Sequence, residues 1–212
     1  MVSLYFGLPG CGKTTMLAKL AHDTDVLIER DLKRISKGLP RKCPYDCVYS
    51  NIELVGLKHY RKITFDMLGR YDVRNALILI DEATIEVDSR DYKKFSQASK
   101  EFILLHRHYR CDIAFFTQQW DGVDKKIRVI TDRVYYLYKG VFSRPWFTRM
   151  YRVPYGIIIP DPKKDSSEKL GEIVQGYCKP SFFVRLFSPW LYRPKYYKYF
   201  DSWEAPLLPP LP

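Results

Sequence analysis

The sequence has no hydrophobic stretch long enough to span a lipid bilayer. Its longest run without a charged side chain covers residues 1–12, whereas a transmembrane helix needs about 20 predominantly apolar residues. The same twelve residues lack the positively charged start of a secretory signal peptide. We therefore expect no transmembrane segment and no secretion, and we expect the protein to be cytoplasmic.

Cysteine is scarce, and its placement does not suggest disulfides. The five cysteines stand at positions 11, 43, 47, 111 and 178, an odd number without a disulfide framework, which suits a reducing compartment. Cys43 and Cys47 form one pair without a second, which gives little support to a zinc site. His106 and His108 are two residues apart, whereas zinc-binding pairs on a helix stand three or four apart. We expect these histidines to be packed or to face a substrate.

Acidic residues are fewer than basic residues in this sequence. The chain has 35 Lys and Arg against 24 Asp and Glu, a net charge of +11. A field of this sign attracts nucleic acid, nucleotides or an anionic membrane, although solubility alone also explains many basic proteins. Residues 30–42 concentrate basic side chains, and residues 182–200 combine aromatic with basic side chains and contain no acid.

The overall composition is that of a folded protein. Apolar residues make up 46% and charged residues 28% of the 212 positions, which excludes a mainly disordered or fibrous chain. Residues 2–6 predict a short strand, the continuous apolar run at 76–80 predicts a strand buried on both faces, and residues 112–116 predict another apolar strand. Apolar residues at helical spacing over 14–22 and 92–109 predict amphipathic helices. This alternation predicts an α/β fold with a mainly parallel sheet flanked by helices.

The remaining segments are expected to be shorter or irregular. Residues 26–28 and 47–52 read as short strands around a basic loop, and two alternating segments, 132–140 and 147–153, as a hairpin or two outer strands. We expect a core over residues 1–140. Residues 141–212 are expected to form a small appendage, partly β and otherwise irregular, rich in proline and aromatics.

The segment Gly7–Thr14 matches the phosphate-binding loop G-x-x-x-x-G-K-[ST] at every fixed position, between a predicted strand and a predicted helix. Its glycines let successive backbone N–H groups wrap around a β-phosphate. Lys13 is expected to reach the β- and γ-phosphates, and the Thr14 hydroxyl to bind Mg²⁺. The predicted ATP-binding residues are Gly7, Pro9, Gly10, Cys11, Gly12, Lys13, Thr14 and Thr15.

A second motif follows the apolar strand at residues 76–80. Asp81 and Glu82 end this strand, as in the Walker B form of nucleoside triphosphatases. Asp81 is expected to hold Mg²⁺ through a water molecule, and Glu82 to orient and deprotonate the water that attacks the γ-phosphate. A polar residue at the tip of the strand at 112–116, Thr117 or Gln118, is expected to contact the γ-phosphate. Together these features predict an ATPase with a catalytic glutamate.

The segments GLPGCGKTT, ILIDEA and LLHRHYRCDIAFFTQQ resemble, in this order and spacing, the zonula occludens toxin (Zot) family. Leu-His-Arg-His at 105–108 is the most particular element, and YFDSWE at 199–204 resembles the end of that domain more weakly. The family contains the cytoplasmic ATPase domains of filamentous-phage assembly proteins and is related to FtsK–HerA DNA-pumping ATPases. Many members continue into a membrane helix and an outer segment, which this sequence does not contain, so toxin activity is not carried over.

The resemblance implies a motor that uses ATP and Mg²⁺ to extrude a single-stranded DNA–protein filament. No local arginine clamp is evident, so we expect a homo-oligomer in which Arg107 of a neighbouring subunit stabilises the γ-phosphate. The alternatives are Arg90, Arg110, Arg128 and Arg133. Two other functions stay open: a nucleotide or small-molecule kinase, and a nucleotide-gated binding protein with little turnover.

The aromatic and basic segment at 182–200 has three interpretations. It could contact an anionic membrane surface, stack on nucleic-acid bases, or pack the appendage onto the core. Pro189 and Pro194 interrupt any continuous helix. We expect peripheral contact with the inner membrane of the host cell or with a membrane-bound assembly partner. We also expect that changing Arg185, Arg193, Lys195 and Lys198 together would leave ATP hydrolysis intact.

Overall fold

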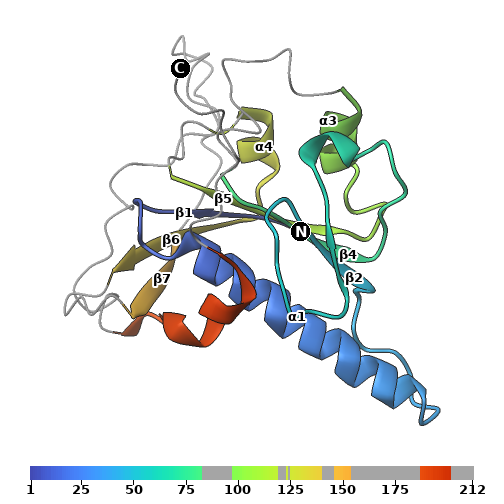
Figure 1. Cartoon of the computed structure of the whole chain (residues 1–212). Coiled ribbons are helices and arrows are strands. Elements are labelled where there is room, and N and C mark those ends of the chain that lie inside the picture. Colours follow the sequence, from blue (N-terminus) through green and yellow to red (C-terminus); the bar gives the residue numbers. More distant parts are fainter. Residues whose placement is uncertain (83–96, 119–122, 124, 140–145, 154–186, 202–212) are drawn as a thin grey trace, which may run out of the picture.

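The computed structural model describes residues 1–82, 97–118, 123, 125–139, 146–153 and 187–201. One eight-stranded sheet forms its centre (Figure 1). The strands, in spatial order, are β3 (Tyr60–Lys62), β2 (Cys47–Ser50), β4 (Ala76–Ile80), β5 (Asp112–Thr117), β1 (Val2–Phe6), β6 (Arg133–Lys139), β7 (Phe147–Val153) and β8 (Trp190–Tyr192). From β3 to β6 all neighbours pair in parallel, and β6, β7 and β8 pair antiparallel.

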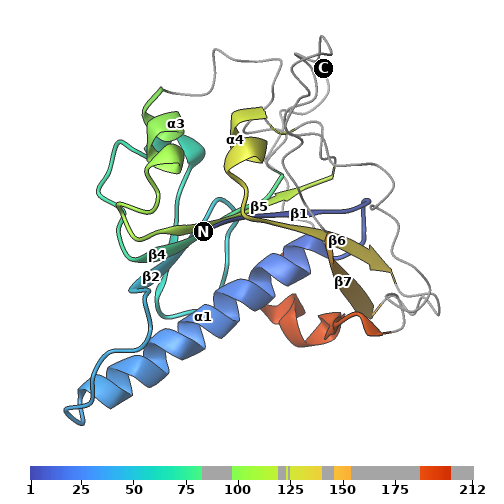
Figure 2. The same ribbon diagram turned by 180° about the vertical axis from the view of Figure 1, so that it is seen from behind.

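Helices cover both faces of the sheet, as Figures 1 and 2 show from opposite sides. The long helix α1 (Lys13–Ile35) and the 3₁₀ helix η3 (Arg193–Tyr199) lie on one face. Helices α3 (Gln97–Leu104) and α4 (Lys125–Ile130) lie on the other, and the short 3₁₀ helix η1 (Phe65–Met67) packs beside α3. The predicted α/β architecture, with a mainly parallel sheet between helices, is therefore confirmed.

The alternation of side chains along each strand divides the hydrophobic core into two layers. In β1, Leu4 belongs to the layer under α3 and α4, whereas its neighbour Tyr5 belongs to the layer under α1. In β5, Phe115 and Phe116 divide in the same way, and both are fully buried. Because the central strands are buried on both faces, they are mainly apolar, and β4 is apolar at every position.

Several boundaries differ from the prediction. Strands β1 and β4 agree with the predicted runs at 2–6 and 76–80, and β5 extends the third run by one residue, to Thr117. The predicted strand at 26–28 is wrong, because these residues continue α1, in which Ile28 is buried and Leu27 is half exposed. The basic segment at 30–42 is therefore helical up to Ile35.

The second predicted helix is shorter than expected. Helix α3 ends at Leu104, and residues 105–110 form turns. His106 is buried there and His108 is exposed, so the first of the pair is packed, as one of the two alternatives predicted. Residues 92–96 of the predicted helix lie outside the described part of the chain.

Part of the expected appendage continues the core sheet. Strands β7 and β8 extend it beyond β6, and η3 packs its rings against α1, where Tyr199 stacks on His22 at 4.9 Å between ring centroids. Tyr196, Tyr199 and Phe200 are buried, whereas Phe187 and Trp190 are exposed. Packing onto the core thus accounts for some of the rings in this segment, and membrane contact through the others stays a prediction.

No helix among the described residues combines the length and the apolar character needed to cross a membrane.

Candidate active site

The predicted phosphate-binding loop connects β1 to α1 at the edge of the sheet where the parallel strands end. Gly10 and Gly12 have positive φ angles of 71° and 98°, a conformation that side chains other than glycine rarely adopt. At Gly12 a Cβ atom would also lie 2.8 Å from Nε of Arg193. The backbone of the loop therefore requires glycine at this position both for its conformation and for lack of space.

Lys13 begins α1, and its side chain is buried. Only 6% of the residue is exposed, and its Nζ donates a hydrogen bond to the carbonyl oxygen of Gly7 at 3.1 Å. The ammonium group thus lies folded back across the loop, next to the position where the loop N–H groups would hold a phosphate. A buried cation with this placement is suited to bind an anionic ligand.

The Thr14 hydroxyl and the Asp81 carboxylate meet at the base of the loop. Thr14 Oγ1 donates a hydrogen bond to Asp81 Oδ2 at 2.8 Å. Asp81 is 6% exposed, and this burial raises the pKa of its carboxyl above the ordinary value, although the hydrogen bonds from Thr14 and the Glu82 N–H act in the opposite direction. Two adjacent oxygen donors, one of them a buried carboxylate, fit the coordination preference of Mg²⁺.

Asn51, just beyond the end of β2, fixes the end of the neighbouring strand β4. Its side-chain amide donates to the Asp81 carbonyl oxygen at 2.9 Å, and its Oδ1 accepts from the Asp81 N–H at 2.8 Å. This two-point contact orients the backbone that carries Asp81 and Glu82. Asn51 was not predicted as a site residue, because it lies inside the predicted strand at 47–52, whereas β2 ends at Ser50.

Glu82 and Gln118 face each other across the tips of β4 and β5. Glu82 has a positive φ of 48°, an unusual conformation for a glutamate, of the kind that often marks functional sites. Gln118 Nε2 donates a hydrogen bond to Glu82 Oε1 at 3.1 Å. Of the two predicted sensor candidates, the structure thus brings Gln118 to the glutamate, while Thr117 is buried and its carbonyl accepts from the Gly7 N–H.

One cavity of about 640 Å³ brings most of the predicted residues together. It is lined by Pro9, Gly10, Gly12, Lys13, Thr14, Thr15, Glu82, Gln118, Arg193, Tyr197, Phe200 and Asp201. Asp81 lies behind Thr14. Cys11 is buried beneath the loop, and this burial raises the pKa of its thiol. The last four lining residues come from the C-terminal segment, and no motif in the sequence predicted that they belong to this site.

The position of Arg193 contradicts two expectations. The expectation that no arginine of the same chain lies near the site is wrong, because Arg193 lines the cavity and its Nη2 donates to the Gly10 carbonyl oxygen at 2.8 Å. Because Arg193 contacts the loop, a combined change that includes Arg193 along with Lys195 and Lys198 is no longer expected to leave ATP hydrolysis intact. Arg185 lies outside the described residues.

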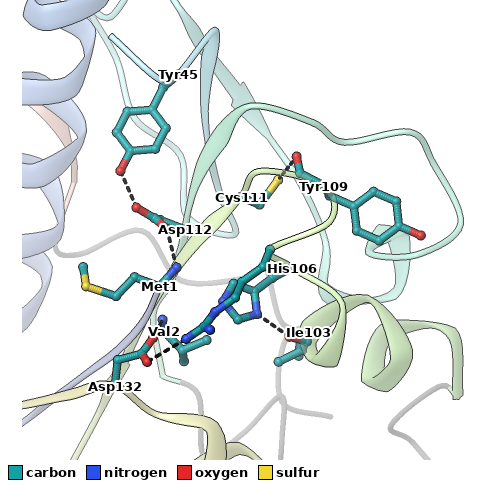
Figure 3. Close-up of polar contacts among 10 residues, drawn as sticks. Met1, Val2, Tyr45, Ile103, His106, Tyr109, Cys111, Asp112 and Asp132 are labelled. Carbon is teal, nitrogen blue, oxygen red and sulfur yellow. Dashed lines mark hydrogen bonds and ion pairs between the residues drawn. The ribbon is translucent and has the colours of Figure 1, made fainter. Parts of the chain in front are cut away.

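Arg107 lies at the opposite edge of the sheet, where the parallel strands begin. Its Nη2 forms an ion pair with Asp132 Oδ1 at 3.1 Å, and its side chain is 73% exposed. Figure 3 shows Asp132 in this region beside Val2, whose N–H donates to Oδ2 of the same carboxylate at 2.8 Å. Arg107 therefore does not reach the cavity of its own subunit, and a role there requires a second copy of the chain.

Comparisons with known proteins agree with this architecture. A family model described as "Zonular occludens toxin (Zot)" matches residues 1–150. No curated protein matches the chain. The crystal structure of the N-terminal domain of zonular occludens toxin from Neisseria meningitidis is similar, with a TM-score of 0.53 and 15% identity, over 94% of this chain and 98% of that one.

A second solved structure is B204, the DNA-packaging ATPase from Sulfolobus turreted icosahedral virus. It has a TM-score of 0.45 and 12% identity, over 71% of this chain and 91% of that one. The Neisseria likeness supports the fold. The family match covers more than half of the sequence and includes the loop, the Asp81–Glu82 pair and Gln118. The chain therefore belongs to the zonular occludens toxin (Zot) family.

Proposed function

We propose that this protein is an ATP-hydrolysing motor that powers the assembly or export of a filamentous phage, a particle of single-stranded DNA and protein. One observation carries the proposal. One cavity is lined by the phosphate-binding loop, Thr14 and a glutamate held by a glutamine, and the Thr14 hydroxyl donates a hydrogen bond to the Asp81 carboxylate behind it, which gives two oxygen donors for Mg²⁺. Membership of the Zot family supports phage assembly as the process that uses this ATP hydrolysis.

The loop and Lys13 bind the triphosphate. Lys13 moves its hydrogen bond from the Gly7 carbonyl to phosphate oxygens, which gives the buried ammonium an anionic partner. Thr14 would hold Mg²⁺ by its hydroxyl and Asp81 through a water, and Asn51 keeps Asp81 in place through its backbone. When bound, Mg²⁺ would neutralise negative charge on the triphosphate.

Glu82 prepares the attacking water. Its carboxylate orients the water and accepts a proton as the bond to the γ-phosphorus forms and the bridging oxygen leaves with ADP. Gln118 holds this carboxylate at 3.1 Å in the free protein and lies at the strand tip where the γ-phosphate is expected. A glutamate directly after the aspartate expected to bind Mg²⁺ favours hydrolysis of ATP over phosphoryl transfer to a small acceptor molecule. We therefore propose an ATPase and not a kinase.

The proposed partners are further copies of this chain and single-stranded DNA or its protein complex. At the strand edge opposite the ATP cavity, a second cavity of about 560 Å³ has four basic side chains in its lining, Arg41, Lys42, Arg107 and Arg110. These basic side chains could bind the phosphate groups of DNA or the γ-phosphate of ATP bound to a neighbouring subunit. We place the motor in the host cytoplasm, in peripheral contact with the inner membrane or a membrane-bound partner.

The test is the rate of phosphate release from ATP, measured against protein concentration with and without single-stranded DNA. A motor releases phosphate without an added acceptor, and faster per subunit as copies associate or DNA binds. Activity only with an acceptor would identify a kinase. ATP binding without turnover under every condition would identify a nucleotide-gated binding protein.

A further inference from the structure

Arg193 is a buried cation on the outer side of the phosphate-binding loop. It begins η3, far along the chain from the loop, and only 8% of it is exposed. Its Nη2 donates to the Gly10 carbonyl oxygen at 2.8 Å, and its Nε donates to Thr148 Oγ1 at 2.8 Å. The guanidinium thus joins η3, β7 and the loop.

Thr148 completes this contact. Its hydroxyl donates to the Cys11 carbonyl oxygen at 2.6 Å while it accepts the bond from Arg193. Because the C=O and N–H of a trans peptide point in opposite directions, fixing the Cys11 carbonyl at Thr148 aims the Gly12 N–H away from Thr148. The peptide between Gly10 and Cys11 is held at both ends, since the Cys11 N–H donates to the Leu8 carbonyl at 3.1 Å.

The charge of Arg193 has no direct counterion. Among the residues that the structure describes, no carboxylate oxygen lies within ion-pair distance of its guanidinium, and the same holds for Lys13. Burying a cation costs free energy unless a negative group compensates it. Glu82 and Asp201, both among the described residues, also line the cavity, but neither forms an ion pair with Lys13 or Arg193, so these two buried cations favour a ligand with several negative charges.

We propose that Arg193, with Thr148, is a positioning residue of the ATP site. Arg193 fixes the Gly10 carbonyl directly and, through Thr148, the Cys11 carbonyl, so that the Gly12 N–H faces the phosphates, and its charge adds to that of Lys13. The family model matches residues 1–150, and the nucleotide site then also includes Arg193, which lies beyond this part of the chain. This inference rests on the proposed function, because it requires that the cavity binds ATP.

The experiment compares equilibrium affinities of the full chain for ATP, ADP and AMP, by calorimetry with Mg²⁺. In Arg193→Gln, we expect the ATP affinity to fall about tenfold or more, as for loss of a charged hydrogen-bonding group. The ADP affinity should fall less and the AMP affinity least, because the charge of Arg193 acts on the phosphates. Arg193→Lys should recover part of the loss, since lysine retains the charge but not the two-point contact.

Two further variants separate positioning from folding. Thr148→Val removes the hydroxyl at nearly constant volume and should also weaken ATP binding, raising KM more than it lowers kcat. Lys198→Gln is the matched control. Lys198 is exposed on the same 3₁₀ helix, with its Nζ 5.0 Å from the centroid of the Tyr199 ring, and its loss should leave all three affinities within about twofold of the unaltered chain.

Unchanged ATP affinity in Arg193→Gln and Thr148→Val would overturn the inference while the proposed function stands. Equal losses for ATP, ADP and AMP, with no recovery in Arg193→Lys, would also overturn it, because such a pattern indicates a structural role alone. If the unaltered chain binds none of the three nucleotides, the proposed function itself fails, and the role of Arg193 fails with it.

Discussion

The side chain of Gln118 donates a hydrogen bond to the carboxylate of Glu82 across 3.1 Å, from the tip of β5 to the tip of β4. Glu82 has a positive φ of 48°, and the neighbouring Asp81 backbone is fixed from the other side by Asn51. The glutamate is thus held in an unusual conformation between two amide side chains. We expect this arrangement to set the direction of the attacking water.

Replacing Gln118 with alanine should lower turnover more than it weakens ATP binding. The variant frees the Glu82 carboxylate to rotate, so we expect kcat to fall about tenfold, equivalent to about 1.4 kcal/mol, while the ATP dissociation constant rises by a smaller factor, from loss of the contact with the γ-phosphate. Gln97→Ala is the matched control, because Gln97 forms a similar hydrogen bond to Glu101 on the distant helix α3, at 2.8 Å. Equal kcat values in both variants would contradict the role of Gln118.

Arg107→Ala should reduce turnover far more than ATP affinity if Arg107 acts on a neighbouring subunit. An arginine supplied to the γ-phosphate contributes about 10³-fold or more to kcat, whereas the exposed ion pair with Asp132 contributes at most about 1 kcal/mol to stability. Arg74→Ala is the control, since Arg74 is also exposed and paired, with Asp72.

Mixing two inactive proteins tests the same idea directly. Arg107→Ala retains its own loop, and Lys13→Ala retains Arg107, so hybrid interfaces contain complete sites. We expect the mixture to hydrolyse ATP faster than either variant alone. No gain at any mixing ratio, or native activity that is independent of concentration down to the monomer, would contradict action between subunits.

His106 should make the stability of the protein depend on pH. Its Nδ1 lies 2.8 Å from the Ile103 carbonyl oxygen (Figure 3), so this nitrogen bears the proton, and its buried Nε2 has no hydrogen-bond partner among the described residues. Protonation would bury an unsatisfied donor. Burial accordingly lowers the pKa of His106 below its ordinary value, partly offset by the bond to Ile103.

The sign of the effect follows from the lowered pKa. Below about pH 6.5 the unfolded chain takes up a proton that the folded chain resists, so the free energy of unfolding falls as the pH drops through this range towards the pKa of the folded state. Denaturant unfolding between pH 5 and 7.5 measures the slope. His106→Gln should flatten it, and His108→Gln, which changes an exposed histidine, should not. Equal slopes in all three proteins would rule out His106 as the source.

The sequence predicted the centre of the molecule well because its signals there are local. The run that forms β4 is apolar throughout, β1 is apolar except for Ser3, and the loop motif lies between a strand and a helix. Asp81 and Glu82 directly follow β4, so their position at the same edge as the loop follows from parallel pairing. Gln118 follows by the same argument from β5.

The errors came from short runs and from long-range contacts. Val26, Leu27 and Ile28 form a three-residue apolar run, which periodicity cannot assign to a strand or a helix. Arg193 and Thr148 contact the loop across 183 and 137 positions of the chain. No local pattern encodes such pairing, because it depends on β7 and β8 joining the sheet and placing η3 against α1.

The central claim is that this cavity binds Mg²⁺-ATP and that Glu82 drives its hydrolysis. The most direct measurement is ATP binding together with single-turnover phosphate release in the unaltered chain, Glu82→Gln and Lys13→Ala. We predict that Glu82→Gln binds ATP normally but releases phosphate about 10²–10⁴ times more slowly, and that Lys13→Ala does not bind. Phosphate release at a near-native rate in Glu82→Gln would contradict the account.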